Sequence, residues 1–410
     1  MNVAYLSFRS IVSRPLSSFL SWLLLAFGVT VVVLILLISD QLKREISKNA
    51  QGIDLVVGAK GSPLQLILSN IFHIDFPTGN IDLKDAAEVS RSRYIEYSIP
   101  ISLGDSYTGY RIVGTTRAYA DLYKGMLQDG RWFEEEMQAV IGHEVAERLG
   151  LRIGDTFESQ HGLDESGEGH GAHPFVVVGI LAENETVINR MILTPLQSIW
   201  EVHGHEQDHE HGEDSVITVQ HLGISVTSEQ YTGEQITALL IKYRSPMGAV
   251  MLPRTINERA NLQSASPAYE TARLFNIIGV GVSVLQWLGL LIIVISGISV
   301  FVALLNSLKD RKYEIAIMRS MGATRQKIFI YILLEGLFTT LLGTLSGLVI
   351  AHLMVGFLGQ KISGLNPEIL YFVPAEGMVL AGSLIIGTLA ALIPSIMAYR
   401  VDISKTLAKG

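Results

Sequence analysis

The sequence predicts an α-helical membrane protein with four transmembrane helices and an α/β domain outside the membrane. Of its 410 residues, 49% are hydrophobic and the mean hydropathy is +0.36, which is too apolar for an ordinary soluble protein of this length. The middle of the chain, residues 41–273, is nevertheless polar and charged. The apolar residues are therefore concentrated towards the two ends, as expected for membrane segments that flank an aqueous domain.

Four apolar segments are long enough to cross a bilayer, which takes about 20 residues of helix. None has a Lys or Arg in its interior, and they cover residues 19–39, 277–305, 328–358 and 378–398. The first could instead be a cleaved signal peptide, but it is longer than a signal core and no Ala-x-Ala-like site follows before Asp40. The predicted organisation is an N-terminal segment at 1–18, the first transmembrane helix at 19–39, an outer domain at 40–276 and a helical membrane domain at 277–410.

Basic residues on the short flanks predict the orientation, because cytoplasmic loops are enriched in Lys and Arg. The run 309–327 between the second and third helices is strongly basic, whereas the loop 359–377 holds Lys361 against Glu368 and Glu376. The chain before the first helix and after the last is basic too, with Arg9, Arg14, Arg400, Lys405 and Lys409. Both termini and the run 309–327 are therefore predicted to be cytoplasmic, and the large domain to lie outside.

The run 309–327 contains the phrase Glu-Ile-Ala-Ile-Met-Arg-Ser-Met-Gly-Ala, from Glu314 to Ala323. This phrase closely resembles the cytoplasmic loop of the FtsX-like/MacB-like permeases, the membrane subunits of type VII ABC transporters. In that family the loop helix docks on an ATPase subunit. The resemblance therefore implies a set of ATPase-docking residues: Glu314, Ile315, Ile317, Met318, Arg319 and Gly322.

The resemblance extends over most of the chain. The stretches 129–133 and 140–155 look like the family's periplasmic core, which usually has a Gly-x-x-x-Ala-x-x-Leu-Gly-Leu-x-x-Gly-Asp phrase. Pro394 and the triplet Arg-Val-Asp at 400–402 match its C-terminal end, although Ile403 replaces the usual proline. The resemblance implies a MacB-like periplasmic core domain at 40–276 and an FtsX-like permease domain at 277–410, in the bacterial inner membrane. It also implies partners: a separate ATPase, a second permease in a homodimer or pair, membrane lipid, and a periplasmic or outer-membrane protein.

The chain shows no nucleotide-binding motif. The stretch 52–66 has the glycines of a phosphate loop in the wrong order, and no Gly-Lys-Ser/Thr occurs. The net charge of −8 argues against a nucleic-acid partner, and the absence of cysteine excludes disulfides and thiolate metal sites. The main hypothesis is therefore a non-catalytic permease subunit. It would couple hydrolysis by a separate ATPase to motion of its periplasmic domain, for export or extraction of a lipoprotein, a peptide or an outer-membrane-linked cargo.

Short patterns predict α/β structure in the outer domain. Runs rich in β-branched residues predict strands at 110–115 and 174–181. Helices are expected at 121–126 and at 144–149, the second one ended by Gly150. Residues 269–275 are expected to continue as helix into the second membrane segment, which would link motion of the domain mechanically to motion of the membrane helices.

Histidines cluster in the predicted loop 161–214. Imidazole interleaved with carboxylates suits zinc, and His-rich tracts are typical of metal binding. The predicted ligands are His161, His170, His173, His203, His205, His209 and His211. The simpler interpretation is a solvated acidic loop, because glycines interrupt the tract. No cofactor is required, but zinc on this loop would link the permease to metal. It also opens an alternative function, a metal-sensing or metal-handling membrane protein that acts through the loop.

The same tract contains the His-Glu-x-x-His pattern of zinc proteases, from His205 to His209. That chemistry needs a stable helix that presents both imidazoles on one face, with Glu206 as base. Gly204 and Gly212 bracket the match and no apolar stripe anchors a helix, so we expect no catalysis. The isolated histidines His73, His143 and His221 are expected in structural or surface roles.

Two features of the third membrane segment suggest contacts. Gly343 and Gly347 form a Gly-x-x-x-Gly step, which lets helices approach closely in lipid. We predict helix packing there and, with the family resemblance, a dimer interface. His352 lies near the outer end of the same segment, where an ionisable group is costly and suggests function. A neutral imidazole at the membrane interface is the alternative.

Overall fold

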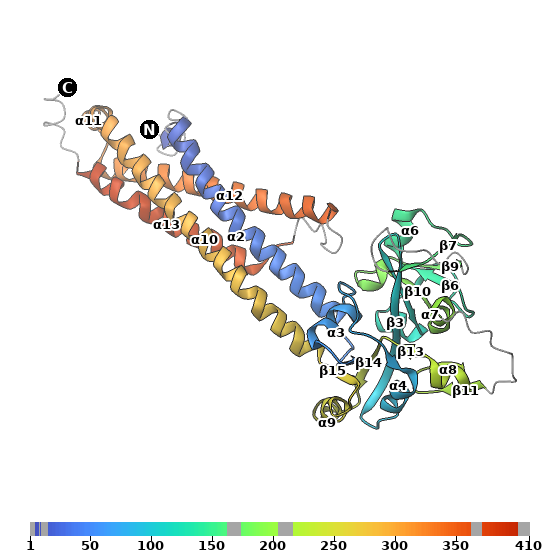
Figure 1. Cartoon of the computed structure of the whole chain (residues 1–410). Helices are drawn as coiled ribbons and strands as arrows, with labels where there is room; N and C mark the ends of the chain where they lie inside the picture. The colour runs from blue at the N-terminus through green and yellow to red at the C-terminus, as the bar shows by residue number, and fades with distance from the viewer. Residues whose placement is uncertain are drawn as a thin grey trace. The chain divides into compact units, whose positions relative to one another are not determined.

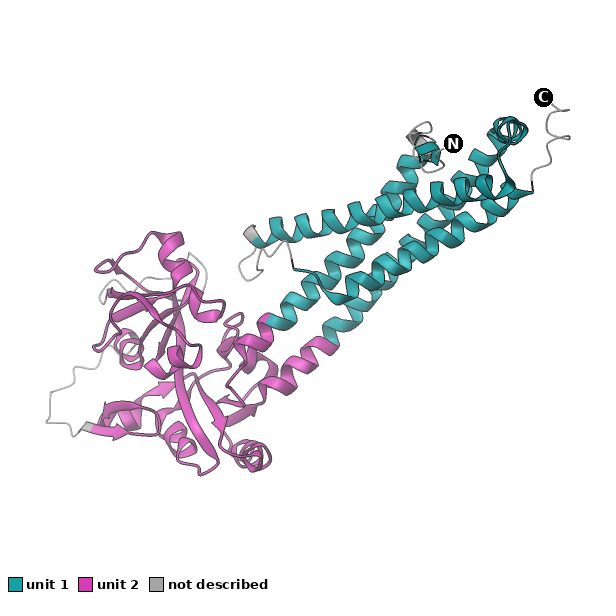
Figure 2. Ribbon diagram, turned by 180° about the vertical axis from the view of Figure 1, so that it is seen from behind, with its two compact units in different colours: residues 1–44, 277–410 teal, residues 45–276 magenta. Residues whose placement is uncertain are grey.

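The computed structural model describes residues 5–7, 9, 15–161, 174–203, 216–361 and 371–400. They fall into two compact units (Figure 2). The first, here called the membrane unit, comprises residues 1–44 and 277–410, and the second, the outer domain, comprises residues 45–276. Each unit has its own hydrophobic cores.

Long helices build the membrane unit (Figure 1). In the described part of the chain, four helices are long and apolar enough to cross a membrane. They are α2 (Pro15–Asn49), α10 (Pro267–Asp310), α12 (Arg325–Lys361) and α13 (Pro374–Tyr399), and the short α11 (Lys312–Ser320) lies between α10 and α12. The prediction of four transmembrane helices is thus confirmed at the level of length and composition.

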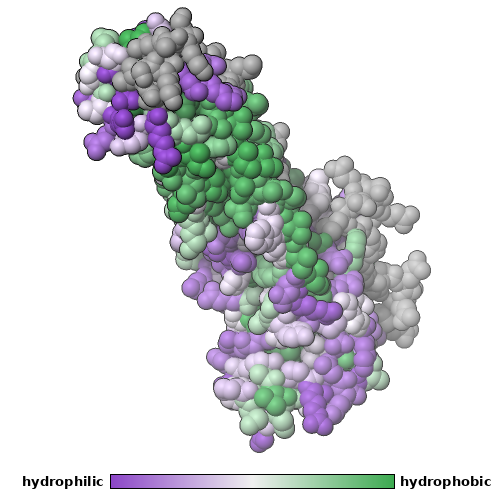
Figure 3. Space-filling view, turned by 90° about the vertical axis from the view of Figure 1, so that its left-hand side faces the viewer, coloured by the Kyte–Doolittle hydropathy of each residue, from purple (hydrophilic) through white to green (hydrophobic). Residues whose placement is uncertain are grey.

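The long helices bury one part of their apolar surface and expose another. Val29 of α2, Ile293 of α10 and Ala351 of α12 meet in one buried cluster. On α10, by contrast, large side chains such as Trp287 (70% exposed) and Ile298 (57% exposed) point outward. Figure 3 shows apolar side chains gathered over these helices. An exposed apolar surface of this extent is the one that lipid covers in a membrane protein.

The outer domain contains a mixed sheet. Among the described residues its strand order is β15-β1-β14-β3-β4-β10-β6-β9-β5, with β7 added to β9 and β8 to β3. The β10–β4 and β6–β9 pairs are parallel and the other pairs are antiparallel. Two separate pairs, β11 with β12 and β13 with β2, lie outside this sheet. The strands of the domain are β1 (Leu55–Ala59), β2 (Ile81–Asp82), β3 (Ile95–Tyr107), β4 (Tyr110–Thr115), β5 (Leu127–Gly130), β6 (Gln138–Ile141), β7 (Thr156–Phe157), β8 (Gln160–His161), β9 (Phe175–Leu181), β10 (Ile192–Pro195), β11 (Val216–Val219), β12 (Ile224–Thr227), β13 (Gln235–Ile236), β14 (Ala238–Tyr243) and β15 (Leu262–Ala265).

Both faces of this sheet are covered. Successive side chains of a strand point to opposite faces, and in β1 Val56 belongs to one buried cluster while Leu55 and Val57 belong to another. Helices supply the other half of each core, for example Leu66 of α3 on the first face and Leu252 of α9 on the second. The helices are α3 (Pro63–Asn70), α4 (Leu83–Ser90), α5 (Arg117–Leu122), α6 (His143–Leu149), α7 (Leu196–His203), α8 (Ser228–Gly233), α9 (Pro246–Asn257) and the 3-10 turn η1 (Val187–Arg190).

The local predictions for this domain are mostly confirmed. Strands β4 and β9 and helix α6 occur where expected, and Gly150 ends α6 in the left-handed conformation with φ 69°. The helix predicted at 121–126 is wrong, because α5 ends at Leu122. Asp121 does not begin a helix: it lies inside α5 and pairs with Arg117 at 3.8 Å. Gly125 N–H then donates to Ala120 O at 2.8 Å and closes the helix end.

The helices α2 and α10 both continue from the membrane unit into the outer domain. For α10 this confirms the prediction that residues 269–275 continue as helix into the second membrane segment. Their ends are built into the core of that domain. Ile46 and Phe275 pack in its largest apolar cluster. Asn49 accepts hydrogen bonds from Tyr123 Oη at its carbonyl and from Val187 N at its side chain, each at 3.0 Å. Lys48 also forms an ion pair with Glu185.

Candidate functional site

Helix α11 is a separate short helix because of the residues at its two ends. Arg311 leaves helical geometry with ψ 11° and thereby separates α11 from α10. At the other end Gly322 adopts φ 96°, which is strained for any residue with a Cβ. Ala323 N–H then donates to Met318 O at 3.0 Å, and this bond satisfies a carbonyl at the helix end. The Met-Gly-Ala sequence therefore fixes where α11 stops.

One face of α11 is buried and the other is open. Ile315 and Ala316 are 0% exposed. Ile315 packs in a cluster with Leu308 of α10, Ile332 of α12 and Ala398 of α13. The opposite face presents Tyr313 (52% exposed), Ile317 (39%) and Met321 (83%). Ile315 therefore belongs to the core that holds α11 in place and is not available to a partner. The predicted docking set includes this buried residue and omits Tyr313 and Met321, which are exposed.

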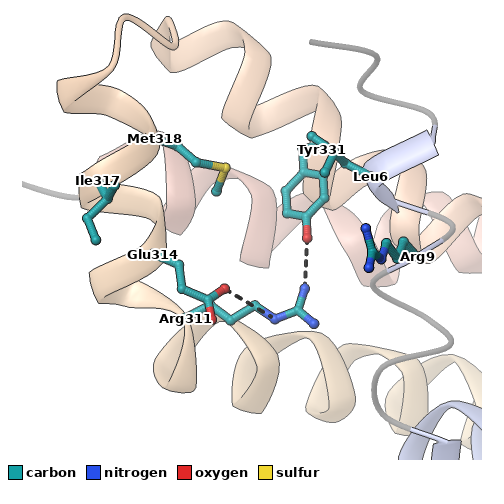
Figure 4. Close-up of a pocket in the computed structure, with 7 residues that line it drawn as sticks. All are labelled: Leu6, Arg9, Arg311, Glu314, Ile317, Met318 and Tyr331. Carbon is teal, nitrogen blue, oxygen red and sulfur yellow. Dashed lines mark hydrogen bonds and ion pairs between the residues drawn. The ribbon is translucent and has the colours of Figure 1, made fainter.

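A pocket of about 390 Å³ lies beside this open face (Figure 4). Glu314, Ile317 and Met318 of α11 line one side, and the Met318 side chain points towards Tyr331. Arg311 donates a hydrogen bond to Tyr331 Oη at 2.7 Å and lies 3.9 Å from the Glu314 carboxylate. The remaining lining residues, Leu6 and Arg9, come from the beginning of the chain, where Ser7 Oγ donates to Tyr331 O at 2.9 Å. Sequence reasoning used Arg9 only for orientation and gave no sign that this segment returns to α11.

The surroundings of the pocket are basic. The run 309–327 carries six Lys or Arg residues against Asp310 and Glu314, and Arg9 adds a further cation. An apolar pocket with a basic rim fits an apolar anchor side chain on a partner that also carries acidic groups. Arg319 is less open than the exposed residues of this helix, and Gly322 acts through the backbone turn.

The two glycines of the Gly-x-x-x-Gly step pack against a helix of the same chain. A Cβ at Gly343 would lie 2.9 Å from the Leu25 side chain, and one at Gly347 would lie 2.7 Å from Ala26 O. These glycines therefore let α2 approach α12 closely inside the membrane unit. They give no support to a dimer interface, because the face is already occupied within one chain.

His352 lies in α12 among polar groups of the membrane unit. Its Nδ1 bonds to Leu348 O at 3.0 Å, and its Nε2 lies 3.2 Å from Tyr371 O and 3.6 Å from a carboxylate oxygen of Glu376. His352 and Glu376 are 6% and 4% exposed. The imidazole is thus a buried group that joins α12 to the start of α13. A functional role and a neutral imidazole at the membrane interface both stay predictions.

The isolated histidines of the outer domain have the structural or surface positions that the sequence predicts. His73 is buried and hydrogen-bonded to Tyr119 Oη at 2.8 Å. Burial, with smaller contributions from Arg111 and Arg190, lowers the pKa of His73 to about 3, so it is neutral at ordinary pH. His143 is more open and lies 3.0 Å from Gln128 Oε1. His221 is exposed and its carbonyl accepts a hydrogen bond from Ser98 at 2.9 Å.

The predicted metal ligands lie largely outside the described residues. This holds for His170, His173, His205, His209 and His211, while His161 and His203 are described only as the last backbone positions of β8 and α7. Within the ranges that the structure describes, no group of three or more His, Asp or Glu side chains could hold a metal ion. The zinc hypothesis thus stays a prediction from sequence.

The chain matches two known family domains, one in each part of the sequence. It matches the MacB-like periplasmic core domain over residues 18–240 and the FtsX-like permease C-terminal domain over residues 287–403. The chain belongs to the MacB/FtsX-like family of type VII ABC transporter permeases. This permease is therefore a membrane protein with an extracytoplasmic domain, and the family predicted from the 314–323 phrase is confirmed.

Individual relatives are distant. The permease is 22% identical to the lipoprotein-releasing system transmembrane protein LolE of Haemophilus influenzae, over 77% of this chain and 76% of that protein. It is 23% identical to the macrolide export ATP-binding/permease protein MacB 1/2 of Paracoccus denitrificans, over 100% of this chain and 58% of that protein. The chain thus spans little more than half of that MacB protein. The crystal structure of the periplasmic region of MacB from Actinobacillus actinomycetemcomitans matches 56% of this chain and 98% of its own length, with 14% identity and a TM-score of 0.35.

Proposed function

We propose that this permease is the non-catalytic membrane subunit of an ABC transporter whose separate ATPase docks on α11 and whose output is motion of the outer domain. The observation that carries the proposal is the open face of α11, with Tyr313, Ile317 and Met321 exposed beside the 390 Å³ pocket. A helix held by a buried face and open on the other is a common way to present anchors to a partner groove. No Gly-Lys-Ser/Thr occurs in these 410 residues, which supports an ATPase outside them.

The relatives support export or extraction as the task. One is named for lipoprotein release and another for macrolide export, and we propose that this permease likewise releases or exports a cargo. A second permease subunit, contact with lipid and a periplasmic or outer-membrane partner belong to the same proposal.

Purification of the tagged permease from its native membranes in mild detergent tests this function. We expect a second subunit with a Walker motif in the eluate, identified by mass spectrometry, and ATP hydrolysis that follows that subunit. Native mass spectrometry of the same eluate counts the permease copies. Recovery of the permease alone, without ATP hydrolysis, from membranes in which it is active would contradict the proposal.

The orientation proposed is an inner-membrane protein with cytoplasmic termini and a periplasmic outer domain. The permease has no cysteine, so single cysteines report position cleanly. Met247 in α9 is 54% exposed, and Gln326 at the start of α12 is also exposed. A membrane-impermeant maleimide added to spheroplasts should label Met247→Cys at once and Gln326→Cys only after the membrane is permeabilised. Labelling in the reverse order would refute this orientation.

Zinc binding by the His-rich loop is a separate part of the proposal, and the clustering of seven histidines in the sequence is its support. An imidazole must be neutral to bind a metal, and its ordinary pKa is about 6.5, so affinity should fall steeply between about pH 7.5 and 5.5. Calorimetric titration of the whole permease with zinc at both pH values measures this. If the zinc titration curve is unchanged after His203, His205, His209 and His211 are replaced by Ala, the solvated-loop interpretation holds and the metal-handling alternative is refuted.

A further inference from the structure

A second pocket, of about 330 Å³, lies on the outer domain, far in sequence from α11. It is formed where the end of α4 and the beginning of β3 meet the turn between β11 and β12 and the residue that follows β14. Its lining includes three arginines, Arg91, Arg93 and Arg244, together with His221 and a single carboxylate, Glu96. The long sequence separation between Arg91 and Arg244 means that the fold, not a local basic run, brings these cations together.

This concentration of positive charge stands out in an acidic domain. Residues 45–276 contain 32 Asp or Glu and 17 Lys or Arg, a net charge of −15. Most other arginines of the domain lie beside a carboxylate, as in Arg148–Glu144 at 3.1 Å, Arg254–Glu258 at 3.2 Å and Arg259–Glu88 at 3.3 Å. The pocket therefore differs from the rest of the domain, where most arginines are paired with a carboxylate.

The arginines of the pocket lack such partners. In the part of the chain that the structure describes, neither Arg91 nor Arg244 makes an ion pair, although Glu96 lines the same pocket. Arg93 stacks on Tyr94, with 5.0 Å between its guanidinium carbon and the ring centroid, and donates to Tyr94 Oη at 2.9 Å. That stacking orients the guanidinium but does not neutralise it. Three guanidinium groups beside a single carboxylate leave an excess of positive charge in the pocket, which a bound anion would offset.

Hydrogen bonds hold together the segments that form the pocket. Ser98 is 6% exposed and its Oγ donates to His221 O at 2.9 Å, which ties β3 to the turn that carries His221. Arg244 N–H donates to Tyr94 O at 2.8 Å and fixes the third arginine beside the stacked one. The backbones that carry the cations are thus held together before any ligand arrives, and a preorganised site loses less entropy on binding.

We propose that this pocket binds a phosphate group. Guanidinium groups match the oxygen geometry of phosphate with paired hydrogen bonds, and three of them exceed the charge that one carboxylate would balance. The phosphate can come from free inorganic phosphate or from the headgroup of a phospholipid, since both present the same oxygens. The pocket volume of about 330 Å³ is large enough for a headgroup-sized ligand, because ligand pockets generally have volumes of about 300 Å³ or more.

The test is a calorimetric titration of the whole detergent-solubilised permease at constant ionic strength. Inorganic phosphate should bind saturably, and the double variant Arg91→Gln, Arg244→Gln should weaken it at least about tenfold, the loss expected when charge-assisted hydrogen bonds are removed. The matched control is Arg254→Gln on α9, an exposed arginine paired with Glu258, which removes a cation away from the pocket and should leave the affinity within about twofold. Because Arg91 and Arg244 are exposed, the fold should be unaffected, which an unchanged circular dichroism spectrum and melting temperature would verify.

Two further titrations distinguish a phospholipid headgroup from free phosphate, and phosphate from carboxylate ligands. Short-chain phosphatidic acid, used below its micelle concentration, should compete with phosphate if a headgroup is the ligand; phosphate binding without competition assigns the pocket to free phosphate. Acetate and a carboxylate-rich tripeptide should bind at least about tenfold more weakly than phosphate. Equal affinity for carboxylates, absence of saturable phosphate binding, or equal weakening by Arg254→Gln would overturn the proposal.

Discussion

Replacing Ile317 or Met321 by Asp is expected to abolish recovery of the ATPase with the permease. Both side chains lie on the open face of α11, so a carboxylate there would be buried unpaired against an apolar groove of the partner. Loss of an interface anchor costs about 2 kcal/mol or more, which weakens binding roughly thirtyfold. Co-purification in mild detergent and the ATP hydrolysis of the eluate measure the effect.

The matched control for this prediction is Met247→Asp. Met247 is 54% exposed on α9 of the outer domain, so the variant introduces the same charge on an exposed apolar residue outside the docking face and should retain the ATPase. Ile315→Asp is a poor test, because Ile315 is 0% exposed in the core of the membrane unit and the variant would unfold that core. Normal ATPase recovery by both the Ile317 and Met321 variants would show that α11 is not the dock.

A flexible insertion in α10 is expected to abolish the biological output while ATPase binding and turnover survive. Helix α10 runs unbroken from Pro267 to Asp310, and Leu274 and Phe275 pack in the core of the outer domain. Gly-Ser-Gly-Ser placed between Asn276 and Ile277 leaves those contacts intact but replaces a rigid element by a flexible linker. Displacement of the membrane helices should then be absorbed by the linker. The readout is the phenotype that deletion of the permease produces.

A helical insertion at the same point is the control. Glu-Ala-Ala-Ala has the same length but continues the helix, adding about one turn of 3.6 residues. We expect this variant to keep a clearly larger share of the output than the Gly-Ser variant. Equal output from the two insertions, or full output from the flexible one, would mean that the outer domain works without a rigid link.

The sequence predicted those features that depend on local pattern. Helix length and hydropathy located α2, α10, α12 and α13, and β-branched runs located β4 and β9. The 314–323 phrase predicted the family, which is confirmed, and it lies on the helix of the candidate site. The end of α11 was readable too, because Gly322 is the type of residue that a left-handed turn requires.

The features that were missed depend on tertiary contacts. Which face of α11 is open could not be read from a nine-residue helix with apolar residues around it, so the predicted docking set includes Ile315, which is buried. The return of Leu6 to Tyr331, and the meeting of Arg91 with Arg244, join segments that are remote in sequence. The Gly343–Gly347 step signalled close packing, but only the folded chain identifies Leu25 and Ala26 as its partners.

Single-cysteine cross-linking can show directly whether a separate ATPase docks on the open face of α11. The cysteine-free permease permits a thiol-reactive photo-cross-linker at Tyr313→Cys, Ile317→Cys or Met321→Cys, and at Met247→Cys as the reference position. Illumination in native membranes, followed by mass spectrometry of the adducts, identifies the neighbour of each site. We expect adducts to a subunit with a Walker motif from all three α11 positions and none from Met247. Absence of ATPase adducts from α11, in membranes where the permease is active, would contradict docking on this face.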